Sequence, residues 1–142
     1  MTIKTEVLRR KLLDIEQAVA RLRAWFPITV EGLEQNLMLQ WAVERGLQVA
    51  AESLFDAGNH LLAGEFRETV DEYRAIPPRL AAHGVIGQDT ARRLIGLAGF
   101  RNLLVHDYAE VDLRKVHAVL GRLDDLEAFV GDVERWLQAR RG

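Results

Sequence analysis

Residues 4–26 read KTEVLRRKLLDIEQAVARLRAWF, and their apolar side chains recur at steps of three and four. The recurring residues are Leu8, Leu12, Ile15, Val19, Leu22 and Phe26. This spacing places them along one face of an α-helix. Proline has no backbone N–H to continue a helix, so we expect the helix to end before Pro27. The stretch therefore predicts a long first helix with one buried stripe.

The segment that follows predicts a second, longer helix. Thr29 has a side chain suited to an N-cap, and the helical pattern runs from there towards Gly58. Its apolar positions are Leu33, Leu37, Met38, Trp41, Val43, Leu47, Val49, Leu54 and Phe55. They occupy more than one face, which predicts a central helix contacted on several sides. Gly46 within it indicates a close helix crossing.

Shorter helical pieces are expected between residues 58 and 88. The range 66–76 is interpreted as a short helix that Pro77 and Pro78 end. One or two further turns are expected over 78–83, with Gly84 just past their end. This part of the chain is therefore predicted to be a short helical insert.

The remaining apolar residues predict two more main helices. Asp89 is expected to cap one that contains His106, and Asp112 to cap a last one. In the last helix, residues 119–137 keep the spacing of a bundle seam. The sequence shows no alternation typical of strands. We therefore predict an all-α fold of four main helices and a short helical insert, as a single domain over residues 1–142.

Composition narrows the class of protein. Of the 142 residues, 49% are hydrophobic and 28% are charged, as in ordinary globular proteins. No apolar run is long enough to cross a bilayer or to resemble a secretory signal, and cysteine is absent. We therefore expect a cytoplasmic protein with no membrane partner, no disulfide and no thiolate metal site. The net charge of −2 argues against a generally basic nucleic-acid binder.

The segment with the richest chemistry is Arg101-Asn102-Leu103-Leu104-Val105-His106-Asp107-Tyr108. Asn102 and His106 lie one helical turn apart and share a face. Arg101 is one step around, and its long side chain can reach the same cleft. Tyr108 points elsewhere on an unbroken helix, but it returns towards the site if the helix frays after His106. The stretch 79–117 that contains these residues is also the one with a net positive charge.

These side chains are suited to cleaving RNA without a metal or other cofactor. Histidine acts as a base or acid near neutral pH, and arginine stabilises the charge that gathers on a phosphorane. Asn102 can orient the imidazole or bind an oxygen. The ribose 2′-hydroxyl attacks the adjacent phosphorus in such a reaction. A structural interpretation stays open: His106 caps the helix end, and Arg101 and Tyr108 form a stacked or hydrogen-bonded pair.

The other histidines and the tryptophans have mainly structural interpretations. His60 is expected to tie the loop after the long helix, or else to face the cleft. His83 is interpreted as a helix C-terminal residue before Gly84, and His117 as solvent-facing. The histidines do not have metal-ligand spacing. Helical apolar positions predict core or interface contacts for three residues, Trp25, Trp41 and Trp136.

The motif and its flanks resemble the HepT family of HEPN-domain toxins. Arg-x4-His-x-Tyr stands between Gly99-Phe100 and Ala109-Glu110. The ranges 56–62, 82–86 and 97–102 are also similar to that family, so the likeness covers about residues 5–140. The resemblance implies a HEPN-type helical bundle that dimerises, with two motif helices lining one cleft.

The resemblance also implies an activity and a partner. Arg101 and His106 are expected to be the RNase residues, supported by Asn102. An MntA-type minimal nucleotidyltransferase antitoxin is expected to add AMP to Tyr108. A phosphodiester there adds negative charge where an RNA phosphate must lie. Two other hypotheses remain: a non-catalytic module that binds nucleotide or RNA beside a nucleotidyltransferase, and a motif that serves only as an interface pair.

Overall fold

The structure is a computed structural model that describes residues 4–106 and 111–141. Within these ranges every regular element is a helix. The elements are α1 (Thr5–Ala24), α2 (Val30–Gln35), α3 (Leu37–Phe66), the 3₁₀ helix η1 (Tyr73–Ala75), α4 (Ile76–Ala82), α5 (Gln88–His106), α6 (Leu113–Leu120) and α7 (Leu123–Arg141). The four longest, α1, α3, α5 and α7, are the predicted main helices, and η1 with α4 is the predicted insert. The all-α expectation is therefore confirmed.

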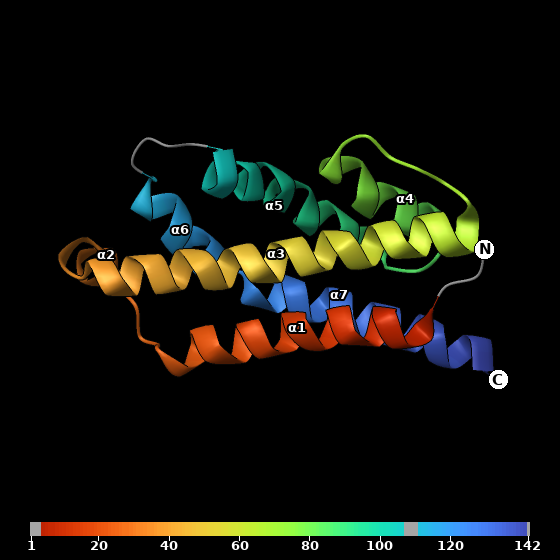
Figure 1. The fold of residues 1–142 in the computed structure, drawn as a ribbon, viewed down its shortest axis with the longest axis horizontal. Helices are drawn as coiled ribbons and strands as arrows, with labels where there is room; N and C mark the ends of the chain where they lie inside the picture. Colours follow the sequence, from red (N-terminus) through yellow and green to blue (C-terminus); the bar gives the residue numbers. More distant parts are fainter. Residues whose placement is uncertain (1–3, 107–110, 142) are drawn as a thin grey trace.

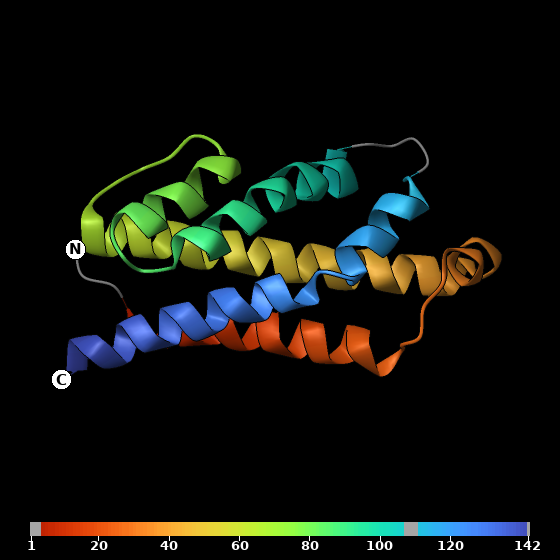
Figure 2. The same ribbon diagram turned by 180° about the vertical axis from the view of Figure 1, so that it is seen from behind.

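Helix α3 runs through the middle of the molecule (Figure 1). Helices α1 and α7 lie side by side along one side of it, and α4 and α5 lie along the other, as the reverse view also shows (Figure 2). Helix α3 contacts all four of these helices. The predicted central position of the second helix is confirmed. None of the helices in the described part of the chain is long and apolar enough to cross a membrane.

The stripe on the first helix is the best-predicted part of the core. Its buried residues are Leu8, Leu12, Ile15, Ala18, Val19 and Leu22. Phe26 was expected to continue the stripe, but it lies beyond the end of α1 and is 43% exposed. The predicted contact at Gly46 is confirmed: a Cβ there would lie 2.9 Å from the Leu22 Cδ2 atom, so the missing side chain lets α1 and α3 approach closely.

The prediction of one helix from Thr29 to Gly58 is wrong at both ends. Thr29 does cap a helix, because its Oγ1 accepts a hydrogen bond from the Gly32 N–H, but that helix is the short α2. The chain is extended at Asn36, whose side chain then accepts from the Leu39 N–H and caps α3. Gly58 does not end α3. A Cβ there would lie 2.4 Å from the Ile76 Cγ2 atom, so Gly58 is the place where α4 packs against α3.

The helix predicted over 66–76 is also wrong. Helix α3 continues to Phe66 and stops at Arg67, whose left-handed conformation (φ 55°) ends it. The chain then crosses to η1 without a regular helix. Pro77 lies at the start of α4 rather than at the end of an earlier helix, because a proline is tolerated in the first turn. The turns expected over 78–83 are present, and Gly84 follows them with φ +75°.

The last two predicted caps have different outcomes. Asp112 is confirmed as a cap, because its side chain accepts a hydrogen bond from the Arg114 N–H. Asp89 is not the cap of α5; it lies in the first turn, where it pairs with Arg93 at 3.0 Å. The single last helix is in fact two, α6 and α7, separated at Gly121.

Candidate functional site

The predicted site residues lie near the C-terminal end of α5. Arg101 and Asn102 are in this helix, and His106 is its last residue. The side chain of His106 and the whole of Tyr108 lie outside the described part of the structure. The geometry of the site is therefore built on Arg101, Asn102 and the residues that contact them.

Arg101 is held by α3. Its Nη2 atom donates a hydrogen bond to the Glu52 carboxylate at 3.1 Å, which makes a charge-assisted pair. Its Nη1 atom donates to the Asn102 amide oxygen at 3.3 Å. Arg101 and Asn102 therefore meet, as the reach of the arginine predicted. The Arg101 side chain is only 15% exposed, so most of it is enclosed by the protein.

An aromatic ring from the insert covers one face of this guanidinium. The Arg101 Cζ atom lies 4.8 Å from the centroid of the Tyr73 ring, within cation–π range. Tyr73 in turn stacks on Phe55 of α3, with centroids 5.1 Å apart and planes 6° apart. Phe55 is fully buried. Arg101 therefore stands on an aromatic stack that is anchored in the core.

The glutamate is itself fixed by its own helix. The Gln48 Nε2 atom donates to the Glu52 carboxylate at 3.2 Å, one turn away on α3. The Nε–H of Arg101, by contrast, is buried without a hydrogen-bond acceptor among the described residues. The orientation of Arg101 is therefore set by its two terminal nitrogens and by its flat face.

A cleft of about 490 Å³ opens beside this arrangement, between α5 and the segment that carries η1. Arg101, Asn102 and Gly99 line it on the α5 side. The opposite lining residues are Asp71, Glu72, Tyr73 and Arg74. The α5 side of the cleft thus offers one arginine and one amide to a ligand. On the opposite side Arg74 pairs with Glu72 at 3.0 Å, which leaves Asp71 as the carboxylate that repels a polyanion approaching from there.

Glu52 and Tyr73 are site residues that sequence reasoning missed. Each occurs in an ordinary context: Glu52 in a helical pattern and Tyr73 in a segment interpreted as a short helix. Glu52 lies 49 residues before Arg101, so no spacing rule connects them. The one available signal was a polar residue on the face of α3 that turns towards α5. That face can be identified only once the packing of the two helices is known.

The other histidines have structural contacts. His60 accepts a hydrogen bond from the Lys4 N–H at 3.1 Å, so it ties the start of α1 rather than the loop after α3. His83 stacks on Phe66 and bonds the Glu68 carboxylate at 2.8 Å. His117 is exposed as expected, and its Nε2 atom is also 3.0 Å from the Ile28 carbonyl oxygen. Across the described ranges, no three His, Asp or Glu side chains gather as metal ligands do.

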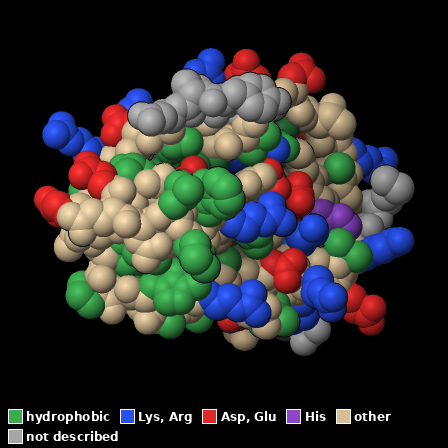
Figure 3. Space-filling view, turned by 60° about the vertical axis from the view of Figure 1, so that its left-hand side comes forward, with side chains coloured by type: hydrophobic (Ala, Val, Ile, Leu, Met, Phe, Trp, Pro, Cys, Tyr) green, Lys and Arg blue, Asp and Glu red, His purple; other side chains and the backbone are tan. Residues whose placement is uncertain are grey.

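A second cleft lies at the end of α3 near α2. Trp41 and Glu44 of α3 line it together with Leu104 of α5, and its volume is about 770 Å³. Burial raises the pKa of the Glu44 carboxyl above its ordinary value. Apolar side chains gather on this end of the molecule (Figure 3), with Met38 83% and Trp41 67% exposed. Trp41 was predicted to make a core or an interface contact, and its exposure excludes the core contact within one protomer.

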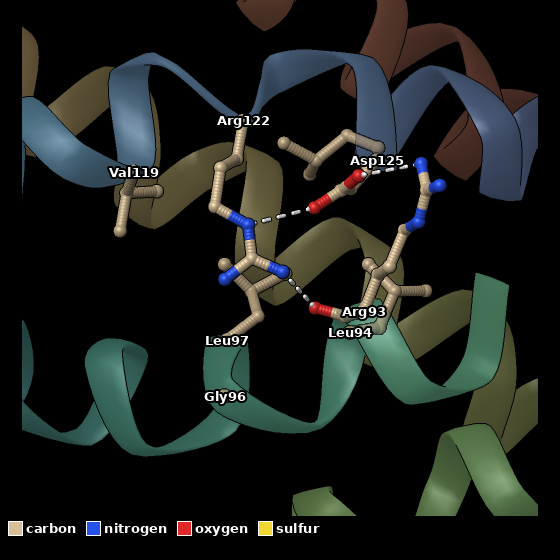
Figure 4. A pocket seen from close by; sticks show the side chains of 8 residues that line it. Arg93, Leu94, Gly96, Leu97, Val119, Arg122 and Asp125 are labelled. Atoms are coloured by element: carbon tan, nitrogen blue, oxygen red, sulfur yellow. Dashed lines mark hydrogen bonds and ion pairs between the residues drawn. The ribbon is translucent and has the colours of Figure 1, made fainter. Parts of the chain in front are cut away.

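A small cavity of about 90 Å³ lies between α5 and the junction of α6 with α7 (Figure 4). The Arg122 Nε donates to the Asp125 carboxylate at 3.0 Å, and its Nη2 donates to the Arg93 carbonyl oxygen at 2.9 Å. Arg93 approaches the same carboxylate at 3.6 Å. Because Asp125 already pairs with both arginines, this network fastens the motif helix to α7.

The sequence is similar to one family of ribonucleases. A family model described as ribonuclease HepT-like matches residues 15–133. The mRNA nuclease HepT of Shewanella oneidensis is 28% identical over 126 residues, which cover 88% of this chain and 94% of that protein.

Solved structures agree with these relatives. A tri-AMPylated Shewanella oneidensis HEPN toxin, in complex with an MNT antitoxin, superposes with a TM-score of 0.80 and 26% identity, over 91% of this chain and 97% of that one. YutE of Bacillus subtilis, a cytosolic protein of unknown function, has a TM-score of 0.84 at 18% identity, over 97% and 93% of the two chains. The second likeness shows the fold alone.

Proposed function

Because the chain belongs to the ribonuclease HepT-like family, we propose that it is the toxin of a toxin–antitoxin pair and cleaves RNA through Arg101 and His106. The whole chain, residues 1–142, acts as one domain in the cytoplasm. The observation that carries the proposal is the placement of Arg101, which is held at the edge of a cleft beside Asn102 on the helix that ends at His106.

The reaction follows from the chemistry of these side chains. His106 takes the proton of the ribose 2′-hydroxyl, whose oxygen attacks the adjacent phosphorus. Arg101 stabilises the negative charge that builds up on the phosphorane oxygens. The bond to the 5′-oxygen then breaks, that oxygen takes up a proton from solvent, and the products are a 2′,3′-cyclic phosphate and a 5′-hydroxyl end. Asn102 supports Arg101 through their shared hydrogen bond. The protein supplies no nucleophile and needs no metal ion.

The active form is a homodimer in which two motif helices line one cleft. Exposed Met38 and Trp41 support this arrangement, because large apolar side chains gathered on one face favour association. The cleft that contains Trp41 also reaches Leu104 of α5. Association through this end therefore brings two copies of the motif together.

A minimal nucleotidyltransferase antitoxin neutralises the toxin by modifying Tyr108. The tyrosine oxygen attacks the α-phosphorus of ATP, pyrophosphate leaves, and the phenol proton is lost. The AMP adds negative charge close to the place where an RNA phosphate must bind. The complex of the Shewanella oneidensis toxin with its antitoxin, in which the toxin carries AMP, supports this mode of control.

The test of catalysis is cleavage of RNA by the purified protein in the presence of EDTA. We expect cyclic-phosphate ends from the wild type and no cleavage by Arg101→Ala or His106→Ala. Arg140→Ala is a matched control, because Arg140 also pairs with a glutamate and stacks on an aromatic ring, far from the motif. Cleavage at the wild-type rate by both motif variants contradicts the proposal, as does nucleotide binding without any cleavage.

The test of the modification is the intact mass after co-expression with the antitoxin. We expect the mass to rise by one or more AMP units, and Tyr108→Phe to abolish the rise. The chain contains only one other tyrosine, Tyr73, so Tyr73→Phe is the matched control and must still be modified. A shift that persists in Tyr108→Phe places the AMP elsewhere.

A further inference from the structure

We propose that Glu52 and Tyr73 are positioning residues for RNA cleavage, which hold the Arg101 guanidinium in the orientation that meets the scissile phosphate. This inference rests on the proposed RNase function and assigns a role to two residues outside the Arg–His motif. Neither residue reacts; both act through Arg101.

The contacts fix the guanidinium in every direction that matters. Glu52 bonds one terminal nitrogen, Asn102 bonds the other, and the Tyr73 ring covers a flat face. Two in-plane bonds set the rotation of the group, and the ring sets its tilt. An arginine side chain has many rotamers in solution. In this protein the entropy cost of fixing one of them is met on folding, before RNA binds.

The remaining donors are those that a phosphate needs. Each terminal nitrogen of arginine carries two N–H groups. Glu52 takes one from Nη2 and Asn102 takes one from Nη1, so among the described residues each nitrogen keeps one N–H without an acceptor. A pair of N–H groups from the two terminal nitrogens is the fork that binds a phosphate in a bidentate manner.

The holding residues are themselves fixed, which a positioning role requires. Gln48 bonds the Glu52 carboxylate, and Tyr73 stacks on the fully buried Phe55. The arrangement therefore reaches from the cleft to the core through α3. A loose support would leave the Arg101 guanidinium free to shift. Misplacement of a catalytic group by about 1 Å costs about 100-fold in rate, so a rigid support matters.

An opposite role for the same ion pair makes a different prediction. If Glu52 merely occupied Arg101 and kept RNA away, its removal would free the cation and speed cleavage. If Glu52 positions Arg101, its removal slows the chemical step. The direction of the change in kcat therefore separates the two roles.

The experiment compares steady-state cleavage of a short RNA by the wild type and four dimeric, folded variants. For Glu52→Gln we expect kcat to fall by about 100-fold with little change in KM, because the lost orientation matters most in the transition state. Tyr73→Leu should lower kcat by about tenfold. Tyr73→Phe should keep kcat near the wild-type value, because the ring remains. Glu65→Gln is the matched control: it removes the equivalent carboxylate from Arg140, which stacks on Trp136, and should leave kcat unchanged.

A double substitution excludes a merely structural role. Lysine cannot form the fork, so in an Arg101→Lys background with residual activity, Glu52→Gln should add little further loss. An additive loss in that background overturns the inference, and so does a Glu52→Gln enzyme that matches or exceeds the wild type. A wild type that cleaves no RNA instead overturns the proposed function itself.

Discussion

Substituting Gly58 with alanine tests how the insert that carries Tyr73 is seated on α3. The new Cβ would lie 2.4 Å from the Ile76 Cγ2 atom and 3.3 Å from the Leu80 Cδ1 atom. Ile76 is fully buried, and its β-branched side chain has little rotameric freedom. The collision therefore cannot be relieved by a small torsion, and α4 must move away from α3.

Two opposing terms set the size of the effect. Alanine is favoured over glycine in a helix by about 1 kcal/mol. Overpacking of a well-packed core costs about 1–3 kcal/mol. The net change in the free energy of unfolding is therefore between no change and a loss of about 2 kcal/mol.

Two other helical glycines provide graded controls. At Gly96 a Cβ meets nothing within 4 Å, so Gly96→Ala should show only the propensity gain of about 1 kcal/mol. At Gly46 the obstacle is the terminal methyl of Leu22 at 2.9 Å, which can give way more easily than a β-branched methyl. The expected order of stability is Gly96→Ala, then Gly46→Ala, then Gly58→Ala.

Urea unfolding followed by circular dichroism measures this order, and RNA cleavage gives a second readout. Since Tyr73 precedes Ile76 by only three residues, displacement of α4 should also disturb the ring under Arg101 and lower kcat. A Gly58→Ala protein as stable as Gly96→Ala would refute the packing argument. Loss of stability with unchanged kcat would refute the link from α4 to Arg101.

Three further predictions concern the other end of α3. Burial raises the pKa of Glu44 in the folded state, so ionisation of this carboxyl lowers the free energy of unfolding at pH values above its ordinary pKa of 4.5. Glu44→Gln should therefore raise the urea midpoint at pH 7, and this gain should vanish below pH 4.5. Asn36→Ala removes the cap of α3 and should cost about 1 kcal/mol in the same assay. Trp41→Asp should shift the protein towards monomer in sedimentation velocity, whereas Leu13→Asp, at another exposed apolar position, should not.

The sequence predicted those features that depend on neighbours along the chain. The stripe on α1, the cap at Asp112 and the close approach at Gly46 each follow from local spacing or from a single residue type. The break at Asn36 was missed because asparagine is tolerated within helices as well as at their caps. Pro77 was misassigned because proline both ends helices and begins them.

The features that the sequence did not predict depend on packing between helices. The apolar residues at the start of α3, such as Met38, were expected to contact neighbouring helices, but Met38 is 83% exposed. Periodicity cannot distinguish a buried face from an exposed apolar one. Glu52 and Tyr73 had no motif to mark them. Their roles appear only when α3, the insert and α5 are placed side by side.

The Arg–His motif is therefore a local signal for a non-local site. The motif places Arg101 and His106 on one helix, but the direction of the guanidinium is set by a carboxylate on α3 and a ring on the insert. An arginine at this position without such partners would spread over many rotamers, and each encounter with RNA would bear the cost of ordering it. It follows that the residue on α3 facing the motif arginine, rather than the motif alone, should separate efficient from poor nucleases among chains that share the Arg-x4-His spacing.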